Sequence, residues 1–277
     1  MLSGVGVICF AASYTVALVL EISRLLFRSG VRGAVMLGFA AAGLIAHTAY
    51  LHYQAVKTPG APLGSEQDWY MVAAWVLVVA YLYLLFYHPR TSFGLFLLPL
   101  ALILIGAGKF FAKEEFTRGP ASKAWGIIHG VSIMLAAVAV LLGFVAGLMY
   151  LSQSRRLKHK LPPSRRLRLP SLEWLQRANS RALVVSALML AMGVVSGVIL
   201  CLMRHAGPTD RLPWYDPVVL STTLMLAWLA CALAVGALYK PARAGRKVAY
   251  FTIVSVVFLA IALGVMLFLN TQHGGPA

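Results

Sequence analysis

The chain has 277 residues, of which 60% are hydrophobic and only 12% are charged. A soluble domain has about 45–50% apolar and about 25% charged residues, so this chain carries too little charge to cover a water-exposed surface. The mean hydropathy of +0.82 agrees with that comparison. These values exclude a soluble enzyme.

The net charge of +16 comes from 24 Lys and Arg against 8 Asp and Glu, and the basic residues lie in short connectors between apolar runs. A nucleic-acid-binding domain gathers such charge on one face, whereas a membrane protein carries it in loops. We therefore expect membrane lipids as partners and no nucleic acid. Cys9, Cys201 and Cys231 lie inside apolar runs without metal-binding spacing, which excludes a disulfide scaffold and a zinc site.

Eight apolar segments are long enough to cross a bilayer, whose hydrocarbon core of about 30 Å requires roughly 20 residues per helix. The sequence therefore predicts an all-α, polytopic integral membrane protein that forms one domain over residues 1–277. The eight predicted transmembrane helices are 3–23, 33–52, 69–87, 93–111, 124–151, 182–203, 217–239 and 248–270.

The connectors on alternate sides of these helices differ in charge, with 17 Lys and Arg on one side and 7 on the other. Lys and Arg accumulate in cytoplasmic loops, so both termini are predicted outside and the basic loop 152–181 in the cytoplasm. No Lys or Arg precedes the first apolar run, so we expect an uncleaved helix rather than a secretory signal. The predicted location is the cell inner (cytoplasmic) membrane.

The basic loop also contains a helix signal. Ser171 is placed to act as an N-cap for a short helix over 172–177, with Trp174 and Leu175 facing the membrane. We expect the basic residues to bind anionic lipid, at about 1 kcal/mol each near the surface, rather than a specific partner.

His47 lies deep within a predicted membrane helix, 33–52. His47 is about fourteen residues from the cytoplasmic end of its helix, roughly 21 Å deep at 1.5 Å per residue. An ionisable side chain at that depth is a candidate functional group. A neutral imidazole bonded to a Ser or Thr of a neighbouring helix explains the position equally well.

Two other histidines fall at the outer ends of predicted helices. His129 begins the fifth helix one turn after Trp125, on the same helical face, and His273 follows the eighth helix. Imidazoles from two helices at one depth can supply both axial ligands of a haem iron. A structural role also explains the positions of these two histidines.

Five segments, taken in chain order, share a pattern with a known family. They are Ala41–Leu51 around His47, Trp125–Leu151, Leu169–Arg181, Gly193–Gly197, and Gly245–Tyr250 followed by the last helix and His273. In these segments the chain resembles the cytochrome c assembly protein family, the CcsA-, CcmC- and HemX-type haem-handling membrane proteins.

The chain also departs from that family's pattern. Trp214, Asp216 and Pro217 remain of the Trp-rich outer segment on which haem lies in the family, but the Lys-Glu pair that ends it is absent. Tyr239-Lys240 stands where a second intramembrane histidine is expected, so His47 has no evident axial partner. These departures favour the shorter, HemX-like branch.

The resemblance implies a haem-handling protein of cytochrome c biogenesis. Non-covalent haem b would lie at the outer face between His129 and His273 as axial ligands, walled by Trp125 and Trp214, with Asp216 orienting a ligand histidine. The expected partner is a membrane protein of cytochrome c maturation, which brings the apocytochrome c.

Other classes of function make different demands on the sequence than haem handling does. No nucleophile or acid–base pair is evident, so we expect no enzymatic activity of the chain on its own. The main alternative is a HemX-like accessory or regulatory membrane protein that keeps the fold without stable haem binding. A transporter would show broken helices or matched repeats, and neither is evident in the sequence.

Overall fold

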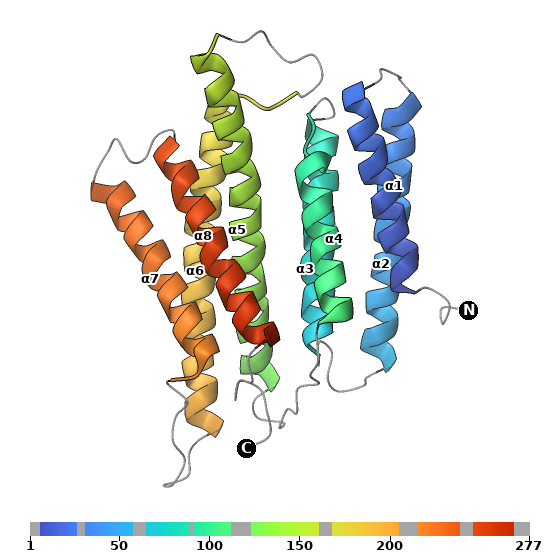
Figure 1. Cartoon of the computed structure of the whole chain (residues 1–277). Coiled ribbons are helices and arrows are strands. Elements are labelled where there is room, and N and C mark those ends of the chain that lie inside the picture. The colour runs from blue at the N-terminus through green and yellow to red at the C-terminus, as the bar shows by residue number, and fades with distance from the viewer. Residues whose placement is uncertain are drawn as a thin grey trace. The chain divides into compact units, whose positions relative to one another are not determined.

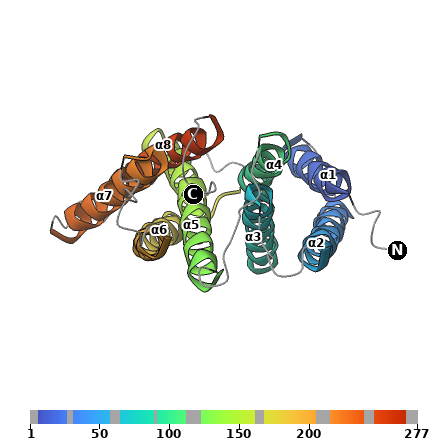
Figure 2. The same ribbon diagram turned by 90° about the horizontal axis from the view of Figure 1, so that it is seen from below.

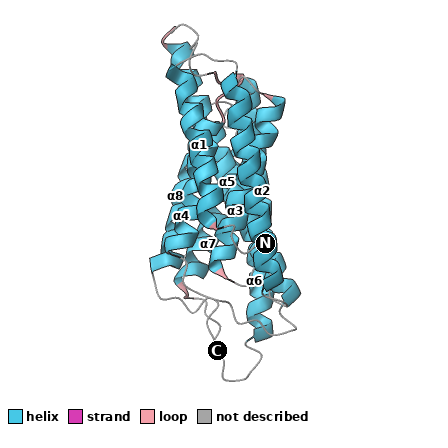
Figure 3. Ribbon diagram, turned by 90° about the vertical axis from the view of Figure 1, so that its right-hand side faces the viewer, coloured by secondary structure: helices cyan, strands magenta, loops and turns pink. Residues whose placement is uncertain are grey.

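The computed structural model describes residues 6–26, 31–57, 65–88, 91–111, 123–160, 168–204, 215–238 and 246–268. Within those ranges the regular structure is helical and no strand is drawn (Figure 3). The helices are α1 (Val7–Leu26), α2 (Val31–Lys57), α3 (Glu66–Tyr87), α4 (Gly94–Phe110), α5 (Lys123–Lys158), α6 (Leu172–Arg204), α7 (Pro217–Leu238) and α8 (Arg246–Phe268).

Each predicted span coincides with one of these helices, which confirms the all-α fold. Seven of the helices in the described ranges are long and apolar enough to cross a membrane. The other, α4, has 17 residues and contains Pro99. The protein is therefore a multi-pass membrane protein, while the count of eight spans and the outward orientation of both termini stay predictions.

The helices enter the basic loop 152–181 further than the sequence indicated. α5 continues to Lys158, and the short helix predicted over 172–177 is the beginning of α6 rather than a separate element. Ser171 caps α6 as predicted, because its Oγ accepts a hydrogen bond from the Trp174 backbone N–H at 3.3 Å. The prediction that Leu175 faces the membrane is wrong, because Leu175 is fully buried.

The chain divides into two compact units, of which the first contains α1–α4 and residues 156–170, and the second contains α5 up to Arg155 and α6–α8. Successive helices within a unit run antiparallel (Figure 1). The expectation of one domain over 1–277 stays a prediction.

In the first unit, α1 lies between α2 and α4, and α3 contacts both α2 and α4 (Figure 2). Glycines allow aromatic rings to approach neighbouring helices closely. A Cβ at Gly43 of α2 would lie 2.6 Å from Cε1 of Tyr14, and a Cβ at Gly94 of α4 would lie 2.8 Å from Cε2 of Tyr81. Both rings are fully buried, so they form the centre of this unit.

In the second unit, α6, α7 and α8 pack against one another, and α5 contacts α6 and α8 through small residues. A Cβ at Gly143 would lie 3.1 Å from Cβ of Ala182 in α6 and 3.3 Å from Cγ2 of Thr252 in α8. Close approach at small residues is how helices associate in lipid, where the hydrophobic effect between helices is absent. Trp228 of α7 donates to Ser255 Oγ of α8 at 3.1 Å, which joins those two helices.

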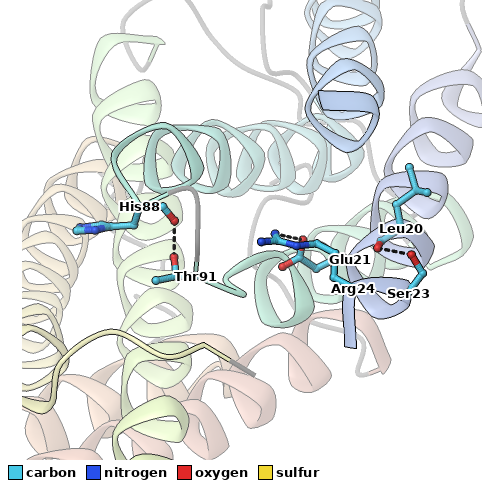
Figure 4. Close-up of polar contacts among 6 residues, drawn as sticks. All are labelled: Leu20, Glu21, Ser23, Arg24, His88 and Thr91. Carbon is cyan, nitrogen blue, oxygen red and sulfur yellow. Dashed lines mark hydrogen bonds and ion pairs between the residues drawn. The ribbon is translucent and has the colours of Figure 1, made fainter. Parts of the chain in front are cut away.

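Connectors that the charge count assigned to the cytoplasm lie at one end of the first unit. Figure 4 shows the Glu21–Arg24 ion pair near the end of α1 together with the His88–Thr91 contact after α3. The Ser92 backbone N–H donates to the carbonyl of Arg168 at 3.1 Å, which brings a residue of the basic loop to the same turn. These residues therefore share one side, as the topology requires.

Candidate functional site

His129 packs against α6 at Gly193 and Gly197. Its Nδ1 is 2.7 Å from the carbonyl oxygen of Gly193, in a partly buried contact between α5 and α6. A Cβ at Gly197, one turn further along α6, would lie 2.9 Å from Cε1 and 3.1 Å from Nδ1 of the same imidazole. The ring therefore occupies the space that a side chain at position 197 would fill.

The contact with Gly193 fixes the tautomer of His129. A backbone carbonyl can only accept a hydrogen bond, so Nδ1 carries the proton. In the neutral imidazole the other nitrogen, Nε2, then holds the lone pair. A metal-ligating histidine commonly donates its second ring N–H to a backbone carbonyl in this way, which orients the ring and raises its basicity as a ligand.

The other residues predicted for the outer site are only partly described. His273 and Trp214 lie outside the described residues. Trp125 is in the first turn of α5, one turn before His129, and is 37% exposed. The predicted pair of axial ligands and its aromatic wall therefore stay predictions.

Asp216, predicted to orient a ligand histidine, is buried at the start of α7. Its Oδ1 accepts a hydrogen bond from the backbone N–H of Val218 at 2.8 Å, and Pro217 occupies the first position of the helix. An acidic N-cap followed by proline at N1 is a common helix start. The contact that the structure gives for Asp216 is therefore that of a helix cap.

His47 lies in the first unit and is fully buried. Its ring stacks on Phe10 at a centroid separation of 4.0 Å and an interplanar angle of 3°. Its Nδ1 is 3.2 Å from the hydroxyl of Tyr14, while Nε2 is buried without a hydrogen-bond partner in the described part of the chain. The neighbour that holds the imidazole is thus a tyrosine of α1, not the serine or threonine considered from the sequence.

Sequence reasoning did not single out the partly buried Glu21–Arg24 ion pair of the first unit. Glu21 Oε2 is 3.1 Å from a guanidinium nitrogen of Arg24, one helical turn away, and the Glu21 side chain is only 1% exposed. Its Cγ would lie 3.2 Å from a Cβ at Gly94, which places the pair against α4. The i, i+3 spacing of opposite charges inside an apolar run was the available signal.

Among the described residues no group of three or more His, Cys, Asp or Glu is arranged to hold a metal ion. Haem needs no such group, because its iron takes axial ligands from single side chains such as histidine. His129 fits one axial position, since its Nδ1–H is bound to a carbonyl and its lone pair is on Nε2. The residues present are therefore compatible with haem.

The comparison with known proteins identifies the family of this polytopic α-helical membrane protein. Residues 68–273, well over half of the chain, match the family model described as Cytochrome C assembly protein. The chain belongs to that family and has a role in cytochrome c biogenesis. No curated protein and no solved structure matches the chain.

The limits of the family match separate the two histidine sites. His129, Asp216 and His273 lie within residues 68–273. α1, α2 and therefore His47 precede the match, although the sequence pattern around His47 resembles the family's intramembrane histidine helix. The family match therefore includes the residues predicted for the outer site and does not reach His47.

Proposed function

We propose that the protein is a haem-handling component of cytochrome c biogenesis, of the HemX-like branch, in the cytoplasmic membrane with both termini outside. It holds non-covalent haem b at its outer face, with His129 and His273 as the axial ligands of the iron. A membrane partner of cytochrome c maturation receives the haem for attachment to apocytochrome c.

The observation that carries this proposal is the hydrogen bond from His129 Nδ1 to the carbonyl of Gly193. It places the proton on Nδ1 and the lone pair on Nε2, in a residue that lies within the family match. The same hydrogen bond joins α5 to α6, and it leaves the unprotonated nitrogen that an axial ligand requires on the other side of the ring.

Bound haem would supply the reactive vinyl groups and the redox-active iron. The chain itself orients the imidazole of His129 through the Gly193 carbonyl, and Trp125 one turn before it provides an aromatic surface. His273 supplies the second imidazole. The haem vinyl groups and the partner would supply the thioether chemistry, while the residues of this chain bind and orient the haem.

The test is the haem content of the purified protein, measured by pyridine haemochrome in mild detergent. We expect a bis-histidine Soret spectrum in the wild type, and a large loss of haem in His129→Ala and His273→Ala that added imidazole partly restores. His52→Ala and His205→Ala serve as controls and should keep the wild-type content. Haem contents of the His129 and His273 variants equal to that of the wild type would contradict the proposal.

A second function has one observation in its favour. The haem-associated Trp-rich segment of the family is reduced in this sequence. An accessory or regulatory protein that keeps the fold without stable haem fits that reduction. A colourless wild-type preparation that binds no added haem would support this function over the first.

A further inference from the structure

The surroundings of His129 also show how the backbone of α6 holds its imidazole ring. The Gly193 carbonyl lies in the middle of α6, where a helix carbonyl already accepts the backbone N–H four residues later. It accepts His129 Nδ1 at 2.7 Å in addition. A carbonyl oxygen has two lone pairs, so one helix carbonyl can serve both donors.

A serine on the next turn also points to this carbonyl. Ser196 is buried, and its Oγ lies 2.9 Å from the Gly193 carbonyl and 2.8 Å from the carbonyl of Met192. The hydroxyl has one proton to donate, and either carbonyl satisfies it. Ser196 can therefore bind Met192 and leave the Gly193 carbonyl to the imidazole.

Gly197 gives the imidazole access to that carbonyl. Its absent Cβ would lie within 3.1 Å of two ring atoms of His129, closer than an ordinary van der Waals contact. Gly193 makes room for the next turn of α5, because its Cβ would lie 2.6 Å from Cδ1 of Ile133. The two glycines thus let α5 approach α6 closely enough for the hydrogen bond.

We propose that Gly193 and Gly197 are positioning residues for the haem ligand: the close approach at Gly197 and the Gly193 carbonyl hold His129 in the tautomer with the proton on Nδ1, so that Nε2 binds the iron. This inference rests on the proposed function. It adds that the backbone of α6 sets the ligand before haem arrives.

The first test is made without haem. The nitrogen-15 spectrum of histidine-labelled apoprotein in detergent at pH 8, assigned by comparison with His129→Gln, reports which ring nitrogen carries the proton. We expect the Nδ1–H form for His129. The Nε2–H form, or a rapid exchange between the two, would overturn the inference, and this result depends on no glycine variant folding.

The second test compares two glycine-to-alanine substitutions in the same unit. In Gly197→Ala the new methyl group displaces the ring, so the tautomer signal should be lost and the haem dissociation constant should rise about 10- to 100-fold, the usual effect of removing such an outer-shell partner. The control is Gly147→Ala, whose Cβ would lie 3.1 Å from Oγ1 of Thr252 in α8 and which should leave both readouts within about twofold. Equal haem affinities for the two variants would overturn the positioning role.

Two further outcomes separate the inference from the proposed function. A wild-type protein that binds no haem contradicts the proposed function and with it the role of His129 as a ligand. A wild-type protein that binds haem but has His129 protonated on Nε2 in the apo form contradicts only the positioning inference. Ser196→Ala should keep the tautomer and the haem affinity, because Ser196 is not needed to hold the ring.

Discussion

Two histidines that pack between helices, His129 in the second unit and His47 in the first, differ in what holds them. His129 donates to a backbone carbonyl, which accepts only, so its tautomer is fixed. His47 meets the hydroxyl of Tyr14, which can donate or accept, so either tautomer is compatible with that contact. The chemistry of the partner, rather than the depth of burial, decides whether an imidazole is prepared to bind a metal.

The surroundings of the two rings reinforce this difference. One face of His47 is covered by the parallel ring of Phe10, and Gly43 lets Tyr14 approach α2. His129 lies instead against bare helix backbone at Gly193 and Gly197. The first arrangement stabilises a helical hairpin by aromatic packing, and the second is the one proposed to present a haem ligand. Substitutions at both sites can test this contrast.

The largest effect is expected from matched histidine-to-phenylalanine substitutions. His129→Phe removes a proposed axial ligand and should reduce the haem content by more than tenfold. Removing only an outer-shell partner of a metal ligand already lowers metal affinity about 10-fold or more. His47→Phe should keep the wild-type haem content, since its ring stacks on Phe10 but lies outside the family match. Pyridine haemochrome measures both, and haem loss in His47→Phe would remove the distinction between the sites.

The next effect concerns the glycine beside each ring. Gly43→Ala places a Cβ 2.6 Å and 2.9 Å from two carbons of Tyr14 and 3.0 Å from Cβ of Ser13. Such overpacking should lower the free energy of unfolding by about 1–3 kcal/mol, measured by denaturant titration in detergent, with the haem affinity unchanged. Gly38→Ala, with nothing within 4 Å of its Cβ, is the control and should be neutral or slightly stabilising. Equal stabilities of the two variants would argue against tight packing of α1 on α2.

The hydrogen bond in the hairpin should contribute less. Tyr14→Phe leaves His47 Nδ1 buried without its hydroxyl partner and should cost about 1–2 kcal/mol of stability. In a double-mutant cycle, Tyr14→Phe should cost less stability in the His47→Phe background than in the wild type. The difference, which is the coupling free energy of the two side chains, should be about 0.5–1.5 kcal/mol. Additive losses would show that the two side chains do not interact in the folded protein.

The smallest effect is expected at Asp216. Asp216→Asn keeps an oxygen that accepts from the Val218 N–H and should change neither stability nor the haem spectrum measurably, whereas Asp216→Ala should cost about 1 kcal/mol. A shifted haem spectrum in Asp216→Asn, read by absorbance at constant haem content, would instead indicate that this carboxylate acts on a ligand histidine.

Much of the fold was predictable from local sequence. Each apolar run overlaps one helix of the described ranges, because a segment in a bilayer must bond every backbone group within its own helix. Seven of these helices have the length and hydropathy for a crossing. Ser171 was predictable as a cap because it precedes a helix-forming segment, and a cap depends only on residues within one turn. The sequence also singled out His129, because the segment around it resembles the family's helix with the outer histidine.

The tertiary structure decided what the side chains meet. Local sequence does not show that Leu175 is buried, that α6 extends back to Leu172, or that Tyr14, 33 positions from His47, is its neighbour. The tautomer of His129 depends on a carbonyl 64 residues away and on a missing side chain at Gly197. Hydropathy and capping are local properties that the sequence determines by itself. The protonation of an imidazole is set by one hydrogen-bond partner, and only the packing of α5 on α6 brings that partner within reach.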